Sequence, residues 1–174
     1  MRKIVLTFGL IAGAVLSAVM LLTLPFQDKI GFESGAVIGY TTMVLAFLMI
    51  YFGVRSYRDN VAGGSVKFGR AFTVGLLIAL VGTACYVTTW EVIYYKLAPD
   101  FVDNYAAYSV KRVKQSGASA EQVAAKEKEM AAFAESYKNP LVNIAYTTLE
   151  PLPVGLIFAL GTAGLMSRKR SVTA

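Results

Sequence analysis

Apolar residues fall into four long blocks, separated by short polar segments and by one long polar segment. The blocks cover residues 4–24, 35–54, 71–95 and 141–166. The first block has no charged residue, and about 21 residues at roughly 1.5 Å each give a helix of about 31 Å, the thickness of a bilayer core. The pattern predicts an all-α fold, a four-helix transmembrane bundle in a single polytopic membrane domain, residues 1–174.

The first block has an alternative interpretation as a cleaved signal peptide, because Arg2 and Lys3 precede it. An ordinary signal peptide has a shorter apolar core and a cleavage site with small residues after it, and this block has neither. We therefore favour an uncleaved transmembrane helix.

Basic residues mark one end of each block, and alternating crossings place these ends on one side of the membrane. They are Arg2, Lys3, Arg55, Arg58, Lys67, Arg70, Arg168, Lys169 and Arg170. The opposite short loop, residues 25–34, has only Lys29, which Asp28 and Glu33 offset. Because cytoplasmic loops are enriched in Lys and Arg, we expect both termini in the cytoplasm.

Composition supports a membrane protein, since 56% of the residues are hydrophobic and only 16% are charged. The formal net charge of +6 could indicate nucleic-acid binding, but the basic residues lie beside apolar blocks, so we expect a lipid bilayer and no nucleic acid as partner. The chain has no histidine and one cysteine, Cys85, which excludes histidine-based triads, histidine metal sites and an intrachain disulfide. We expect Cys85 to fill space in the third helix, and we expect no metal and no cofactor.

Residues 97–139 form the long polar segment, which predicts an outward-facing helical hairpin. Hydrophobic side chains recur at helical spacing in both halves: Phe101, Tyr105, Tyr108, Val123, Met130, Phe133 and Tyr137. Gly117 can adopt the left-handed conformation that ends a helix, and Ser119 with Gln122 matches a capping box that begins the next. These apolar stripes either join the two helices to each other or form a docking surface for a partner.

Small residues recur every fourth position in all four blocks. They are Gly9, Gly13 and Ser17; Gly35 and Gly39; Ala71, Gly75 and Ala79; and Gly155, Ala159 and Ala163. Such stripes let transmembrane helices approach closely. We expect them to pack the helices of one bundle, with contacts between the copies of a homo-oligomer as the alternative.

Two acidic residues lie inside the apolar blocks, Glu91 in the third and Glu150 in the fourth. At roughly 1.5 Å per residue, Glu91 lies about 31 Å from Arg70 and Glu150 about 27 Å from Arg168. Both acids are therefore expected at a similar level near the outer boundary of the membrane.

Glu150 is the candidate for a polar intramembrane site. Pro151 and Pro153 remove backbone donors and free carbonyl groups around it. An acid within the membrane is costly unless it is paired, hydrated or protonated, so we expect a partly dry pocket in which Glu150 holds or shares a proton, formed with Glu91 and Tyr146. The alternative is that Glu91 reaches water and Glu150 bonds to a neighbouring helix.

Several short motifs resemble a bacterial membrane family catalogued only as a domain of unknown function, number four-one-nine-nine. The matching stretches are residues 65–72 with Gly75, residues 99–101, residues 139–140 and residues 150–155. The resemblance implies a four-helix membrane protein, commonly of Gram-negative bacteria, and we expect it in the inner (cytoplasmic) membrane. It implies no assigned activity and supplies no catalytic residues.

Three classes of function remain. We favour a non-enzymatic scaffold or accessory subunit that acts through the outer hairpin, with a periplasmic or membrane protein as partner. A small proton- or cation-coupled carrier that uses Glu150 is the alternative. A membrane enzyme ranks third, because the sequence has no nucleophile–base set and no metal-ligand cluster.

Overall fold

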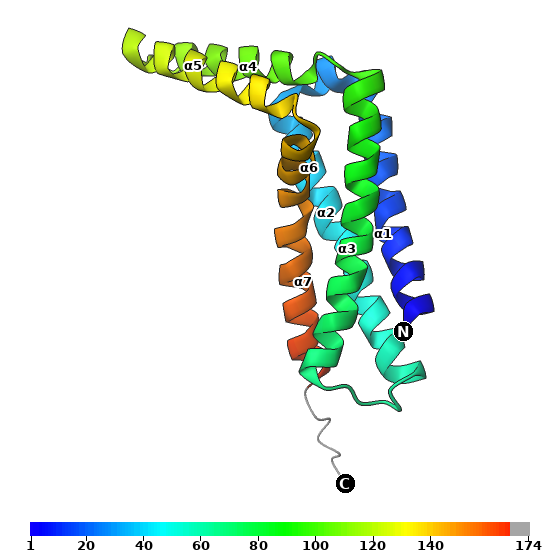
Figure 1. The fold of residues 1–174 in the computed structure, drawn as a ribbon. Coiled ribbons are helices and arrows are strands. Elements are labelled where there is room, and N and C mark those ends of the chain that lie inside the picture. Colours follow the sequence, from blue (N-terminus) through cyan, green and yellow to red (C-terminus); the bar gives the residue numbers. More distant parts are fainter. Residues whose placement is uncertain (168–174) are drawn as a thin grey trace. The chain divides into compact units, whose positions relative to one another are not determined.

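The computed structural model of the protein describes residues 1–167, and these contain helices and turns but no strand. In chain order the elements are α1 (Arg2–Thr23), η1 (Leu24–Phe26), α2 (Gln27–Asn60), α3 (Phe68–Val92), the π-helix η2 (Ile93–Leu97), α4 (Phe101–Gln115), α5 (Ala120–Tyr137), α6 (Pro140–Leu149) and α7 (Pro151–Met166) (Figure 1). The predicted all-α class is confirmed. Arg168, Lys169 and Arg170, which contributed to the predicted orientation, lie outside the described residues.

Three helical stretches of the described chain are long and apolar enough to cross a membrane, which suggests that the protein is associated with one. They are Arg2–Asn60, Phe68–Leu97 and Pro140–Met166. The first is 59 residues long and includes α1, η1 and α2. The chain reverses direction within it, so that α2 runs back beside α1 (Figure 1). The reversal contains Pro25 in η1 and Gly31, whose φ of 72° is a conformation that glycine adopts readily.

The helices belong to two compact units, a division that the prediction of one domain does not make. The first unit comprises Met1–Thr89 and the chain from Thr148 onward, and the second comprises Trp90–Thr147. The first unit therefore contains α1, α2, most of α3 and α7. The second contains the end of α3, η2, α4, α5 and most of α6.

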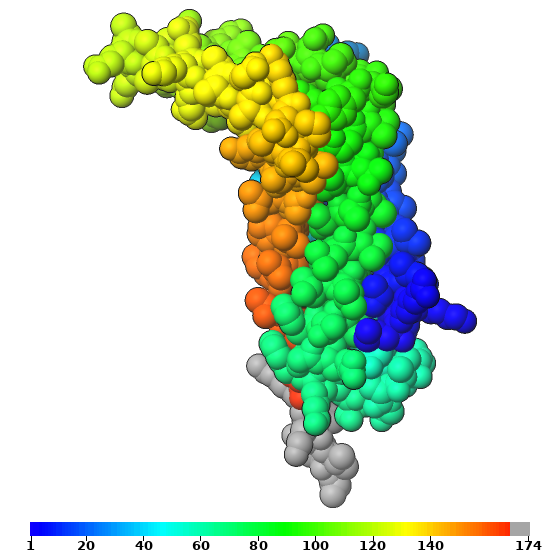
Figure 2. Space-filling model, viewed as in Figure 1, coloured from blue at the N-terminus to red at the C-terminus, as the bar shows by residue number. Residues whose placement is uncertain are grey.

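The first unit packs α1, α2, α3 and α7 around one apolar core. Large side chains such as Phe47 and Ile50 of α2 and Ile78 of α3 have no exposed surface, and neither have Ala79 of α3 and Ala159 of α7. Figure 2 shows the surface atoms of α3 and α7 in contact along their length. Small residues bring these backbones close together, which is how helices associate in lipid, where burial of apolar surface gives no advantage.

The second unit has an aromatic core. Tyr94 and Tyr137 are buried, and their ring centroids lie 5.4 Å apart. Trp90 and Phe101 meet edge to face with their centroids 4.8 Å apart, and Phe133 lies against Tyr137. Edge-to-face pairs of this kind add to the stabilisation that comes from burial. This core joins the end of α3 to α4 and α5.

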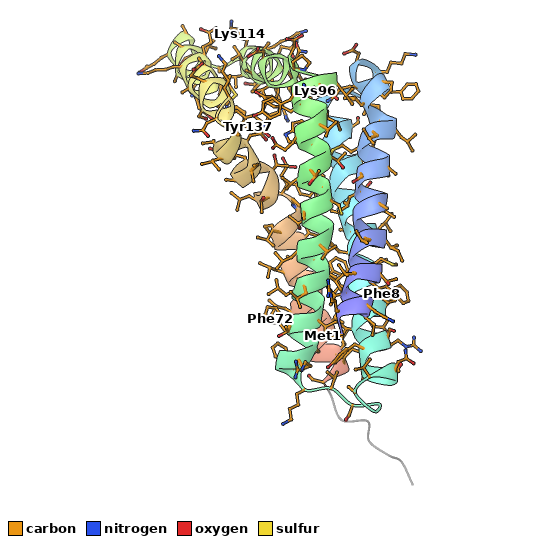
Figure 3. All side chains as sticks on the ribbon, turned by 45° about the vertical axis from the view of Figure 1, so that its right-hand side comes forward. Met1, Phe8, Phe72, Lys96, Lys114 and Tyr137 are labelled. Carbon is orange, nitrogen blue, oxygen red and sulfur yellow. The ribbon has the colours of Figure 1, made fainter. Side chains whose placement is uncertain are left out.

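The turn that joins α4 to α5 contains the residues that the sequence predicted for it. Gly117 has a φ of 78°, and Ser119 and Gln122 form the reciprocal capping box at the start of α5. The two helices pack side by side (Figure 3). Lys114 Nζ of α4 lies 2.8 Å from Glu127 Oε1 of α5. The left-handed glycine and the capping box that the sequence predicted are both confirmed.

Candidate functional site

Glu150 lies where α6 ends and α7 begins, in the first unit. Its backbone is helical, with φ of −75° and ψ of −61°. Pro151 follows at the first position of α7, where its missing N–H and that of Pro153 interrupt the hydrogen-bond ladder. The predicted interruption at Glu150 is thus a local break in the hydrogen bonding, while the chain itself continues in a helical conformation.

The carboxylate of Glu150 is bound by a neighbouring helix. Tyr86 of α3 donates its hydroxyl proton to Glu150 Oε2 over 2.6 Å. Taken over the whole residue, Glu150 is exposed at the surface of the described chain, and a partly dry pocket around its carboxyl group stays a prediction. A bond from a neighbouring helix is what the alternative interpretation expects of Glu150, and it is also compatible with a polar pocket.

Glu91 and Tyr146 belong to the second unit. Glu91 is half-buried, and its Oε1 is enclosed without a hydrogen-bond partner among the described residues. The ring of Tyr146 lies 5.5 Å from that of Phe133 and 6.1 Å from that of Tyr137, centroid to centroid. Tyr146 therefore contributes to the aromatic core of its unit. A pocket that joins these residues to Glu150 stays a prediction.

A chain of buried hydrogen bonds in the second unit was not predicted. Trp90 Nε1 donates to Tyr137 Oη over 2.9 Å, and Thr147 Oγ1 donates to Asn143 Oδ1 over 3.1 Å. Tyr137 Oη lies 3.2 Å from Thr147 Oγ1. Because the single proton of Thr147 goes to Asn143, Tyr137 donates to Thr147. The four side chains thus form a directed chain across α3, α5 and α6. The sequence contains one signal for this chain: Asn143 and Thr147 are polar residues four positions apart in an apolar block, so they lie on the same face of a helix.

Asn143 ends this chain with an unused donor. The residue has no exposed surface, and its Nδ2 has no hydrogen-bond partner among the described residues. A buried donor without an acceptor costs free energy. The bond from Thr147 offsets part of the cost of burying this amide.

Four of the predicted packing glycines lie where helices touch. A Cβ built on Gly9 would lie 2.6 Å from Val81 Cβ, and one on Gly13 would lie 2.5 Å from Cys85 Cβ. These contacts join α1 to α3, and they place Cys85 as a space-filling residue beside a glycine.

The stripes of α3 and α7 meet each other. A Cβ built on Gly155 would lie 2.8 Å from Ala79 Cβ, and one on Gly75 would lie 3.2 Å from Ala159 Cα. Ala79 and Ala159 are themselves fully buried. Only small side chains fit at this crossing.

Gly35 and Gly39 of α2 do not make the predicted contacts. A Cβ built on either would meet no atom within 4 Å among the described residues. The reason is that residue spacing defines a face of a helix but does not say which stretch of that face meets a neighbour. Ser17, in the stripe of α1, instead forms a hydrogen bond of 2.7 Å to Thr89 of α3.

An open groove lies along the α4–α5 pair, with a volume of about 590 Å³. We call it the α4–α5 groove. It is lined by Asp103, Ala106, Ala107, Val110, Lys111, Lys114, Glu127, Met130, Ala131 and Ala134. Its floor is apolar and made mostly of alanine, and its rim carries charges of both signs.

Residues 7–168 match a family model described as a protein of unknown function, DUF4199. The chain belongs to the DUF4199 family. The resemblance seen in the sequence motifs is therefore confirmed. Neither a search of curated proteins nor a search of solved structures gives a match.

The motifs that carried the resemblance to DUF4199 lie at helix starts and helix contacts. Asn139 Oδ1 accepts a hydrogen bond of 3.0 Å from the backbone N–H of Leu141, and Pro140 is the first residue of α6. Val66, just before α3, is buried, and Gly155 lies against Ala79 as described above. In this DUF4199 chain the motifs thus determine where helices begin and how closely they approach.

Proposed function

We propose that this DUF4199 protein is a non-enzymatic, multi-pass protein of the bacterial inner membrane, a scaffold or accessory subunit that binds a protein partner through its α4–α5 pair. The α4–α5 groove is the observation that carries this proposal. Small apolar side chains between charges of both signs leave room for the backbone of a partner helix and provide charged groups that can orient it.

The packing of α4 and α5 leaves this surface free for a partner. Val102 is the only buried residue of α4, and Met130 and Tyr137 are the only buried residues of α5. The aromatic residues that join the pair to the end of α3 lie in the separate core around Tyr137. The contact between the two helices therefore buries only part of their apolar surface. Ala107 and Ala131 in the groove stay exposed.

In the proposed topology the chain crosses the membrane four times, with both termini in the cytoplasm and the α4–α5 pair in the periplasm. The reversal between α1 and α2 supports two crossings in the first 60 residues. Arg55, Arg58, Lys67 and Arg70 flank the turn between α2 and α3, which favours the cytoplasmic side for this turn.

Photocrosslinking from single positions tests the proposed binding role. A photoreactive residue at Ala131, exposed in the groove, is compared with one at Ala132, which is exposed on the same helix but does not line the groove. In intact membranes we expect protein adducts of defined mass from Ala131 and none from Ala132. The same adducts from both positions, or none from either, would contradict the proposal.

A proton- or cation-coupled carrier is the second candidate. The presence of an acidic residue, Glu150, at a break in an apolar helical stretch favours it. The bond from Tyr86 gives this carboxylate a structural role instead, which is why we rank the carrier second. Proton-linked flux in proteoliposomes that disappears in Glu150→Gln, while the variant folds normally, would reverse this ranking.

A further inference from the structure

The charges around the α4–α5 groove are balanced. Asp103 and Glu127 are acidic, whereas Lys111 and Lys114 are basic. A uniformly acidic or basic partner would leave charges of one sign opposite like charges, which is unfavourable. A second copy of the same surface, related by a two-fold rotation, supplies both signs.

One exposed row on α4 shows how the charges of two copies would meet. Asp103, Ala107 and Lys111 follow each other at four-residue spacing, and all three are exposed. Asp103 and Lys111 are equally distant from Ala107 along the helix. When two α4 helices cross in antiparallel orientation at Ala107, Asp103 of each copy therefore meets Lys111 of the other. A parallel crossing would instead bring Asp103 against Asp103.

The surface between these charges permits a close approach. Ala106 and Ala107 of α4 and Ala131 and Ala134 of α5 leave room for the backbone of a facing helix. Rows of residues four apart are the ridges by which helices most often pack, with axes about 8–10 Å apart. Small side chains at such a crossing allow a distance between the helix axes near the lower limit of this range.

Two of the four rim charges, Asp103 and Lys111, are available for contacts with a partner. Lys114 and Glu127 form an ion pair with each other at 2.8 Å. Asp103 and Lys111 form no close ion pair within the part of the chain that the structure describes, and Asp103 interacts only at longer range with the positive charge of Lys138. In the dimer, Asp103 of each copy would therefore form an ion pair with Lys111 of the other copy.

We propose that the α4–α5 groove is a homodimer interface, in which two copies of this chain pack α4 against α4 in antiparallel orientation, with Ala107 on the two-fold axis. This inference rests on the proposed function, because it names the partner of the same surface.

Disulfide crosslinking of the full-length protein tests the dimer. The background is Cys85→Ala, so that Ala107→Cys or the control Ala132→Cys supplies the single thiol. A residue on a two-fold axis lies beside its own copy, so mild oxidation in native membranes should convert Ala107→Cys to a dimer on a non-reducing gel. Ala132→Cys should form several-fold less dimer. Matching thermal unfolding curves ensure that both variants are folded.

Charge reversal in the Ala107→Cys background tests the register. Asp103→Lys alone or Lys111→Asp alone places like charges opposite each other, so each should lower dimer formation by roughly three- to tenfold, the range expected for two exposed ion pairs. The double variant restores opposite charges and should recover the crosslinking of the parent.

Two results would overturn the dimer: equal crosslinking of Ala107→Cys and Ala132→Cys, or a double variant no better than the single ones. Adducts from Ala131 to a different protein, without self-crosslinking at Ala107, would also overturn the dimer but leave the proposed function standing. Absence of every adduct from both positions would overturn both.

Discussion

Gly155 and Gly161 lie on the same helix, α7, but in different surroundings. A Cβ at Gly155 would come within 2.8 Å of Ala79 Cβ, whereas at Gly161 it would meet nothing within 4 Å among the described residues. Gly155→Ala must therefore push α3 and α7 apart. Ala79 Cβ is fixed to its backbone and cannot turn away, so the strain has no local relief.

The same substitution should have opposite effects at these two positions. We expect Gly155→Ala to lower the free energy of unfolding by about 1–3 kcal/mol through overpacking. Gly161→Ala should raise it by up to about 1 kcal/mol, because alanine favours the helix. Thermal unfolding in detergent measures both. Equal shifts for the two variants would show that the crossing of α3 and α7 is not tightly packed.

At the scale of elements, the buried hydrogen-bond chain joins α3, α5 and α6. Tyr137→Phe removes its central hydroxyl, so Trp90 Nε1 loses its acceptor and Thr147 loses its donor. We expect a loss of about 1–3 kcal/mol, the cost of leaving buried polar groups unpaired. Trp90 is the only tryptophan, so its fluorescence should shift as well.

Tyr95→Phe is the matched control, because Tyr95 is adjacent to the same core but 44% exposed. It should leave the emission of Trp90 and the unfolding temperature almost unchanged. If Tyr137→Phe behaves like Tyr95→Phe, the hydrogen-bond chain does not hold these helices together.

Elements with local signals could be predicted from the sequence. Gly117 and the capping box at Ser119 were identified because the residues that form each feature lie within a few positions of each other. Pro151 likewise reveals the break before α7, since the missing N–H is a property of the residue itself.

Features that depend on which surfaces meet could not be predicted in this way. The stripe at Gly35 and Gly39 looks like the stripe at Gly9 and Gly13, but only the second has a helix packed against it. The bond between Tyr86 and Glu150 joins residues 64 positions apart, and no local pattern indicates it. Spacing along the chain defines a face, whereas the partner of that face is decided by the tertiary structure.

At the scale of the whole molecule, the proposed function requires the α4–α5 pair and the turn between α2 and α3 to lie on opposite sides of the membrane. The described chain combines apolar helical stretches with the polar α4–α5 pair. The basic residues that flank the turn between α2 and α3 favour the cytoplasm for that turn. The proposed topology therefore assigns the α4–α5 pair to the periplasm, where its groove would be available to a partner.

Accessibility of single cysteines to a membrane-impermeant thiol reagent tests this topology most directly. In the Cys85→Ala background, Ser116→Cys probes the exposed turn between α4 and α5, and Val61→Cys probes the exposed turn after α2. We predict that spheroplasts label Ser116→Cys at once and label Val61→Cys only after the membrane is disrupted. Labelling of Val61→Cys in intact spheroplasts, with Ser116→Cys protected until disruption, would contradict the proposed topology.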